Sequence, residues 1–270
     1  MSLDYNHLVD DLAAEQAALE RVLAVMPETS WDAPTHAPGW LTRDQVAHLA
    51  FFDEKAALAI KDPDAFRAHV AELQADESTD LERSYITRSR AMTPTTVLAW
   101  WREASSFLIT VARPLDAKAR MPWYGPDMSG ASFITARLME TWSHGLDIVD
   151  AVGIPRPDTD RLKHVATLGV RTRGFSYLAN GMTPPPDPVY VELVAPSGER
   201  WSFGEPDAAN RITGSATDFC RVVTQRRHPA DTNLVVDGPA AEEWMAIAQA
   251  FAGPPGVGRQ PGEFGKEGPS

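Results

Sequence analysis

Cysteine is almost absent from this chain of 270 residues, since Cys220 is the only one. A single thiol cannot form a disulfide within the chain, and it cannot build a zinc site of the cysteine-rich kind. Any metal ion in this protein must therefore be held by imidazole and carboxylate groups. Cys220 lies in the apolar run 218–223, which favours a small buried side chain over a reactive thiol.

Basic residues are also scarce. The chain has 25 Lys and Arg against 37 Asp and Glu, and its formal net charge is −12. Affinity for nucleic acid comes mainly from the neutralisation of phosphates. The two densest basic segments, residues 171–173 and 226–228, are too short to follow a duplex. We therefore expect no nucleic-acid partner.

Long hydrophobic runs are missing as well. No stretch approaches the run of about eighteen apolar residues that a transmembrane helix needs, so we expect no membrane partner. Residues 1–12 are acidic and lack the basic and then apolar pattern of a secretory signal. These features favour a cytoplasmic protein.

The first half of the chain has the periodicity of amphipathic helices joined by loops. Residues 3–25 place apolar side chains on one stripe, and a proline-rich loop follows as far as Trp40. Thr42 and Gln45 have the form of a capping box, which predicts a helix from here to residue 60. Further helices are predicted from Asp62–Pro63, over 94–111 and over 132–152. This arrangement indicates a four-helix bundle over residues 1–152.

The pattern changes after Gly153. Helices are predicted at 160–178, 212–225 and 239–251, and strands at 189–194, 200–203 and 233–236. The expected fold class is therefore α+β, with the bundle followed by a smaller α+β domain over residues 153–252. Residues 253–270 are rich in Gly, Pro and charge, and we expect a flexible tail.

One predicted helix carries a pair of candidate metal ligands. Glu140 and His144 lie four residues apart, so a carboxylate and an imidazole point the same way. Two ligands rarely hold a divalent ion firmly, and His48, in the apolar part of another helix, is a candidate third. A His₂Glu set binds zinc and leaves positions open, and the same arrangement suits ferrous iron. The spacing alone is also compatible with a solvated helix face and a histidine in the core.

Two motifs resemble those of a known family. Residues 38–42 (PGWLT), Asp44 and residues 46–49 (VAHL) resemble the signature of the DinB-like superfamily. Residues 136–147 (ARLMETWSHGLD) resemble the second motif of one branch, the mycothiol-dependent maleylpyruvate isomerases and related actinobacterial metal-binding proteins. The resemblance implies a bundle with zinc on His48, Glu140 and His144, and water in the remaining positions.

The C-terminal half is similar to the same branch more loosely. That branch has a helix of the pattern Ala-x-Asp-Leu, followed by apolar residues and Gly-Arg. Residues 216–219 (ATDF) match its start, but residues 225–227 (QRR) replace Gly-Arg. The resemblance implies a catalytic arginine at Arg226 or Arg227. Both residues also suit the alternative role of cations at a helix C-terminus.

Metal-bound histidines usually donate their second ring N–H to another group. Asp44 lies four residues before His48, and Asp147 lies three residues after His144, so these carboxylates are the candidate acceptors. Asp44 is equally well placed to favour the N-terminus of its own helix.

These observations lead to one functional hypothesis and one alternative. The protein is expected to bind zinc or another divalent metal at an open His₂Glu site, and to act as a mycothiol-dependent isomerase or S-transferase on a small electrophilic substrate. The alternative is a metal-containing binding protein without turnover, whose C-terminal domain holds a small apolar ligand or partner.

Overall fold

The computed structural model of the chain describes residues 4–75 and 80–266. The predicted start of the first helix at residue 3 and the end of the predicted tail, 267–270, lie outside these ranges. The chain divides into two compact units, Met1–Arg156 and Pro157–Ser270. Each unit is described by itself.

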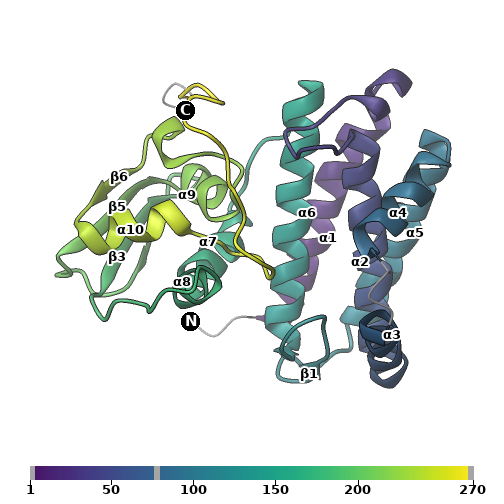
Figure 1. Ribbon diagram of the computed structural model, residues 1–270, viewed down its shortest axis with the longest axis horizontal. Coiled ribbons are helices and arrows are strands. Elements are labelled where there is room, and N and C mark those ends of the chain that lie inside the picture. The colour runs from purple at the N-terminus through teal and green to yellow at the C-terminus, as the bar shows by residue number, and fades with distance from the viewer. Residues whose placement is uncertain (1–3, 76–79, 267–270) are drawn as a thin grey trace. The chain divides into compact units, whose positions relative to one another are not determined.

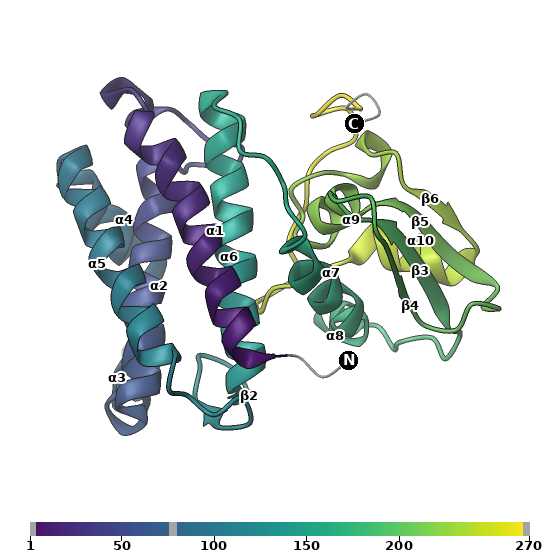
Figure 2. The ribbon, with the colours of Figure 1, turned by 180° about the vertical axis from the view of Figure 1, so that it is seen from behind.

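The first unit is a four-helix bundle, as the sequence predicts. Its long helices run alongside one another in both ribbon views (Figure 1 and Figure 2): α1 (Tyr5–Val25), α2 (Thr42–Lys61), α5 (Pro94–Ala112) and α6 (Gly130–Val152). Helix α2 packs against both α5 and α6. The connections contain η1 (Glu28–Asp32), α3 (Pro63–Ala75), α4 (Leu81–Arg90) and a two-stranded ribbon of β1 (Arg120–Met121) and β2 (Met128–Ser129).

The bundle is held by the apolar stripes of its helices. On α1, Leu8, Leu12 and Leu19 are fully buried, as their helical spacing requires. Burial of each such side chain contributes about 1.5–3 kcal/mol. Trp101 of α5 and Ile148 of α6 lie in the core as well. None of the described helices is long and apolar enough to cross a membrane.

The N-terminus of α2 differs from the prediction by one residue. The helix begins at Thr42, so Leu41 rather than Thr42 is the N-cap. Asp44 then occupies the third helical position, and its Oδ2 accepts a hydrogen bond of 2.9 Å from the Leu41 backbone N–H. Gln45 therefore does not cap the helix, because Asp44 takes that role and leaves the amide side chain for another contact.

The ends of α6 place the candidate ligands in the middle of a straight helix. Ser129 Oγ accepts a hydrogen bond of 3.2 Å from the Ser132 N–H at the start. At the other end Gly153 has φ +67°, the left-handed conformation that suits glycine after a helix. Glu140 and His144 are far from both ends, so the helix backbone fixes their separation.

The second unit is an α+β fold around a four-stranded sheet with the order β4-β3-β5-β6. Strand β3 (Val189–Val194) pairs in antiparallel with β4 (Arg200–Phe203) and in parallel with β5 (Asn210–Ser215), and β5 pairs in antiparallel with β6 (Val235–Asp237). The helices are α7 (Leu162–Arg171), α8 (Arg173–Ala179), α9 (Ala216–Val223) and α10 (Pro239–Ile247), with η2 (Pro229–Asp231) between α9 and β6. Helix α9 packs on β3 and β5, and α10 packs on β5 and β6.

The predicted helix over 212–225 is wrong in its first part. Residues 210–215 are strand β5, in which Asn210 and Ile212 are buried and the residue between them is more exposed, which is the alternation of a strand. The helix begins only after Ser215, whose Oγ accepts a hydrogen bond of 3.0 Å from the Asp218 N–H. The predicted helix over 160–178 is likewise two helices, α7 and α8.

Candidate metal centre

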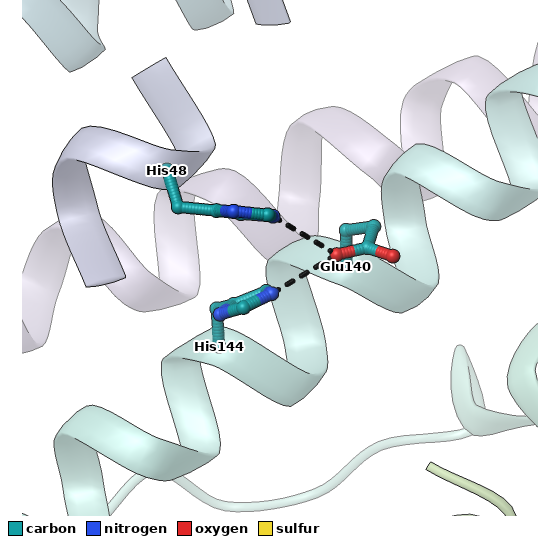
Figure 3. Close-up of side chains that lie close together, drawn as sticks. All are labelled: His48, Glu140 and His144. Atoms are coloured by element: carbon teal, nitrogen blue, oxygen red, sulfur yellow. Dashed lines mark hydrogen bonds and ion pairs between the residues drawn. The ribbon is translucent and has the colours of Figure 1, made fainter. Parts of the chain in front are cut away.

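The structure brings the three predicted ligands together inside the bundle. His48 projects from α2, and Glu140 and His144 project from successive turns of α6 (Figure 3). Their candidate ligand atoms all lie within 4.8 Å of one another. Among the described residues this is the group of acidic, histidine or cysteine side chains with the geometry to hold a metal ion.

The carboxylate of Glu140 lies between the two imidazoles. Its Oε2 is 3.3 Å from His48 Nε2 and 3.0 Å from His144 Nε2. The two rings stack with their centroids 4.0 Å apart. The side chains keep an exposure of 15% for His48, 20% for Glu140 and 12% for His144. The cluster is therefore mostly buried, and each of its three side chains keeps a small exposed fraction.

Each imidazole has a second partner on its other nitrogen. His48 Nδ1 lies 3.2 Å from the hydroxyl of Tyr85, which comes from α4. His144 Nδ1 lies 2.6 Å from Oε1 of Gln45, one turn before His48 on α2. Both rings are thus held with Nε2 toward Glu140. In this orientation both Nε2 atoms can bind the same metal ion.

Asp44 does not accept a hydrogen bond from the ring of His48, whose Nδ1 contacts Tyr85 instead. Asp44 is fully buried, and its carboxylate accepts a hydrogen bond of 2.6 Å from Arg90 Nη2 and one of 2.9 Å from Ser89 Oγ. With the Leu41 N–H as a further donor, this carboxylate serves the helix N-terminus, the other role that the sequence left open. Asp147 is buried on α6, but the partner of His144 Nδ1 is Gln45.

Electrostatics favour a neutral imidazole and an ionised carboxylate. Burial, followed by the positive charge of His144, lowers the pKa of His48 from 6.5 to about 3. Burial acts to raise the pKa of Glu140, but hydrogen bonds from His144 and His48 outweigh it and hold that pKa well below its ordinary value. A neutral His48 and an anionic Glu140 are the protonation states that metal ligation requires.

Aromatic rings surround the triad. Trp40 stacks on the ring of His144 with a centroid distance of 6.0 Å, and Phe52 lies 4.6 Å from the ring of His48. Tyr85 lies edge-on to His48 at 5.7 Å. These rings restrict water around the ligands, which strengthens electrostatic interactions there.

A buried ion pair lies beside the triad and was missed by sequence reasoning. Arg137 of α6 donates to Asp53 of α2 through Nε at 3.0 Å and Nη2 at 2.9 Å. The sequence does carry a signal for this pair, because Asp53 and Arg137 interrupt the apolar faces of two helices whose other residues there are buried.

Gln45 and Tyr85 were missed for different reasons. Gln45 was assigned to a cap, and no pattern marked the helix that carries Tyr85.

Arg226 and Arg227 belong to the second unit, directly after α9. The preceding Gln225 has φ +58°, which turns the chain sharply at the helix end. Arg226 Nη1 donates to the Thr224 carbonyl at 2.7 Å, and the Arg227 guanidinium lies 3.7 Å from the ring centroid of Phe264. Arg227 is 6% exposed, so most of its side chain is part of the interior of that unit.

Cys220 is fully buried in α9. Burial raises the pKa of its thiol well above the ordinary value. The reactive form of cysteine is the thiolate, so this residue is a packed side chain rather than a nucleophile.

Comparison with known proteins gives a consistent picture. The family model described as mycothiol maleylpyruvate isomerase N-terminal domain matches residues 12–149, which include all three residues of the triad. Two proteins from two strains of Mycobacterium tuberculosis, both described as uncharacterised, are 43% identical over 256 residues. The match covers 95% of this chain and 99% of each relative.

Two solved structures share the fold over most of the chain. The crystal structure of the mycothiol-dependent maleylpyruvate isomerase superposes with a TM-score of 0.57 at 14% identity, over 83% of this chain and 90% of that chain. A histidine-to-alanine variant of that isomerase gives a TM-score of 0.56 at 13% identity, with the same coverage. At this identity the likeness establishes the fold and leaves the chemistry to the residues of the site.

Proposed function

The chain belongs to the mycothiol maleylpyruvate isomerase N-terminal domain family, and from this premise we propose that it is a metal-dependent enzyme acting on a thiol-linked substrate. The observation that carries the proposal is the position of Glu140 Oε2 between the Nε2 atoms of His48 and His144. Zinc is the proposed ion, because a His₂Glu set is an established ligand set of open zinc sites.

The residues of the triad fit such an ion. Two ligands bound to one zinc ion at about 2.0–2.1 Å in tetrahedral geometry lie about 3.3 Å apart. Glu140 Oε2 is 3.3 Å and 3.0 Å from the two imidazole nitrogens, so these distances are close to those between two ligands of one zinc ion. Both Nδ1 atoms have partners of their own, as metal-bound histidines require. His48, Glu140 and His144 would hold the ion.

A divalent ion at an open site supplies Lewis acidity, which lowers the pKa of a bound thiol so that thiolate is present near neutral pH. The side chains prepare the site for this chemistry. The carboxyl group of Glu140 is already ionised and supplies a negative charge. His48 stays neutral, with a lone pair on one ring nitrogen. The rings of Trp40 and Phe52 keep bulk water away from the two imidazoles.

The proposed reaction is attack of the thiolate sulfur on an electrophilic carbon. Addition to an activated double bond, rotation about the resulting single bond and elimination of the thiolate give isomerisation, with the thiol regenerated. Displacement at another electrophile forms a carbon–sulfur bond while the leaving group departs with the electron pair of the bond it breaks, which gives S-transfer. We propose mycothiol as the thiol.

The first experiment measures metal content and thiol binding. Purified protein is analysed for zinc by mass spectrometry, and mycothiol is then titrated into the zinc-loaded protein by calorimetry, with glutathione as the comparison thiol. We expect one zinc ion per chain and a preference for mycothiol. Zinc without thiol binding would reject thiol-dependent catalysis and favour a metal-containing binding protein without turnover.

The ligand assignment has a matched pair of variants. His48→Ala should lose zinc, whereas His69→Ala should keep it, because His69 lies on α3 and contacts Tyr124 rather than the triad. Full zinc occupancy in His48→Ala would show that the ligands are wrongly assigned.

A further inference from the structure

We propose that Gln45 is a positioning residue that orients His144 for metal ligation, and that Thr35 fixes the orientation of the Gln45 amide. This inference rests on the proposed metal site and adds two residues outside the triad. Its evidence is a chain of hydrogen bonds that runs from His144 through Gln45 and Thr35 to the backbone of Trp40.

The chain of hydrogen bonds has a definite direction. Gln45 Nε2 donates to Thr35 Oγ1 at 3.0 Å, and the Thr35 hydroxyl donates to the Trp40 carbonyl at 3.1 Å. The same hydroxyl oxygen also accepts from the Ala37 N–H at 3.3 Å. Since the single proton of Thr35 is given to Trp40, its oxygen faces the amide nitrogen of Gln45. The amide oxygen is therefore the atom that faces His144.

The orientation of Gln45 determines which nitrogen of His144 carries a proton. A carboxamide oxygen only accepts hydrogen bonds, and Gln45 Oε1 lies 2.6 Å from His144 Nδ1. Nδ1 must be the donor. With Nδ1 protonated, Nε2 is the only ring nitrogen whose lone pair can bind a metal, and it lies 3.0 Å from Glu140 Oε2. A metal ion would there take the place of the Nε2 proton that His144 donates to Glu140 in the metal-free protein. Gln45 thus selects the form of His144 that can bind a metal.

His48 has no equivalent selection. Its Nδ1 lies 3.2 Å from the hydroxyl of Tyr85, and a phenol both donates and accepts. Tyr85 can therefore serve either form of the His48 ring. The task of fixing a tautomer in this centre falls on Gln45, which is fully buried and so is shielded from bulk water.

The loop before α2 makes this arrangement rigid. Thr35 N donates to the Trp40 carbonyl at 2.9 Å, and Thr42 N donates to the Ala33 carbonyl at 2.9 Å, so the two ends of the loop are tied together. The ring of Trp40 stacks on His144. This one loop consequently acts on His144 in two ways. Trp40 stacks on the face of its ring, and Thr35 orients the Gln45 amide that contacts its Nδ1.

The test compares three variants by zinc affinity, measured by competition with a chelator. Gln45→Met keeps the size of the side chain but removes the acceptor, and we expect zinc affinity to fall by about 10- to 100-fold, as for other partners of metal ligands. Gln45→Glu restores an acceptor and should recover affinity to within a few-fold. Gln16→Met is the matched control, since Gln16 is a buried glutamine on α1 outside the site.

A second readout is the protonation of His144, followed by ¹⁵N NMR of the histidine rings. The proposal expects a protonated Nδ1 in both the metal-free and the zinc-loaded wild type, and loss of its hydrogen-bonded signal in Gln45→Met. An unprotonated Nδ1 in the wild type, or zinc binding by Gln45→Met as tight as that of the wild type, overturns it. Failure of the proposed function is distinct, because it appears as zinc binding without thiol binding in the unmodified protein.

Discussion

Arg137 and Asp53 join the two helices that carry the candidate ligands. Both nitrogens of Arg137 that bind Asp53 reach the same oxygen, Oδ1, and the side chains are 4% and 0% exposed. Burial of either side chain in its charged form without the other would destabilise the fold, because the desolvation of a charge is offset only by an opposite charge close to it. The pair therefore ties α2 to α6 beside the triad.

The first prediction concerns the stability that this pair provides. Asp53→Ala leaves the charge of Arg137 buried without its carboxylate, so the free energy of unfolding should fall by about 3–5 kcal/mol. The double variant Asp53→Leu/Arg137→Met removes both charges and should be more stable than the single variant. Urea unfolding checks both values, and equal losses in the single and double variants would contradict a paired role.

The second prediction separates the two neighbours at the start of α2. Asp44→Asn weakens hydrogen bonds from Arg90 and the Leu41 N–H, so the free energy of unfolding should fall by about 1–3 kcal/mol. Zinc affinity should stay close to that of the wild type, because the acceptor for His144 is Gln45. A large loss of zinc affinity in Asp44→Asn, at unchanged stability, would return Asp44 to the metal site.

These two neighbours also show why the site was predicted only in part. The triad could be predicted because Glu140 and His144 are one helical turn apart, which is local information in the sequence. The two family motifs then pointed to His48 as the third residue. The partners of the imidazoles depend on where α2 begins. A shift of one residue exchanges the roles of Asp44 and Gln45, and the sequence pattern does not determine a helix end that closely.

The same limit applies to the second unit. Strand β3 was predicted with its observed bounds, because its β-branched and apolar residues lie between turn signals. The sequence pattern predicts a helix from residue 212 onward instead, where the structure has the strand β5. The strand conformation of residues 210–215 comes from pairing with β3 and β6, which is tertiary, and the cap at Ser215 was the local signal that separates strand from helix. The predicted flexible tail and the predicted roles of the arginines stay predictions.

The third prediction concerns the effect of metal on stability. An ion that binds only the folded protein adds about 2.7 kcal/mol at a free concentration a hundredfold above its Kd. Zinc should therefore raise the melting temperature of the wild type, and a chelator should reverse the change. Glu140→Gln should lose most of this response, whereas Glu103→Gln should keep it, because Glu103 is an exposed residue of α5. Equal responses in both variants would place the ion elsewhere.

The last prediction concerns pH and the metal-free protein. The pKa of His48 is about 3 in the folded protein and about 6.5 in the unfolded chain. Between these values the unfolded chain binds a proton that folded His48 does not bind, so the free energy of unfolding rises with pH. On acidification from pH 6.5 it should fall by up to about 1.4 kcal/mol per pH unit from this residue.

Glu140 acts in the same direction but over a lower range. Its pKa is held well below the ordinary value of 4.5, so its contribution to stability is present above pH 4.5 and is lost as the pH falls further. The range from pH 6.5 to 4.5 therefore separates the contribution of His48 from that of Glu140. His48→Gln keeps an amide N–H that can donate to Glu140 but removes the titrating ring, and its stability curve should be flatter than that of the wild type over this range. Urea unfolding at several pH values measures both slopes. Parallel curves would mean that the pKa of His48 in the folded protein is close to its value in the unfolded chain, and the lowering of this pKa by burial would have to be abandoned.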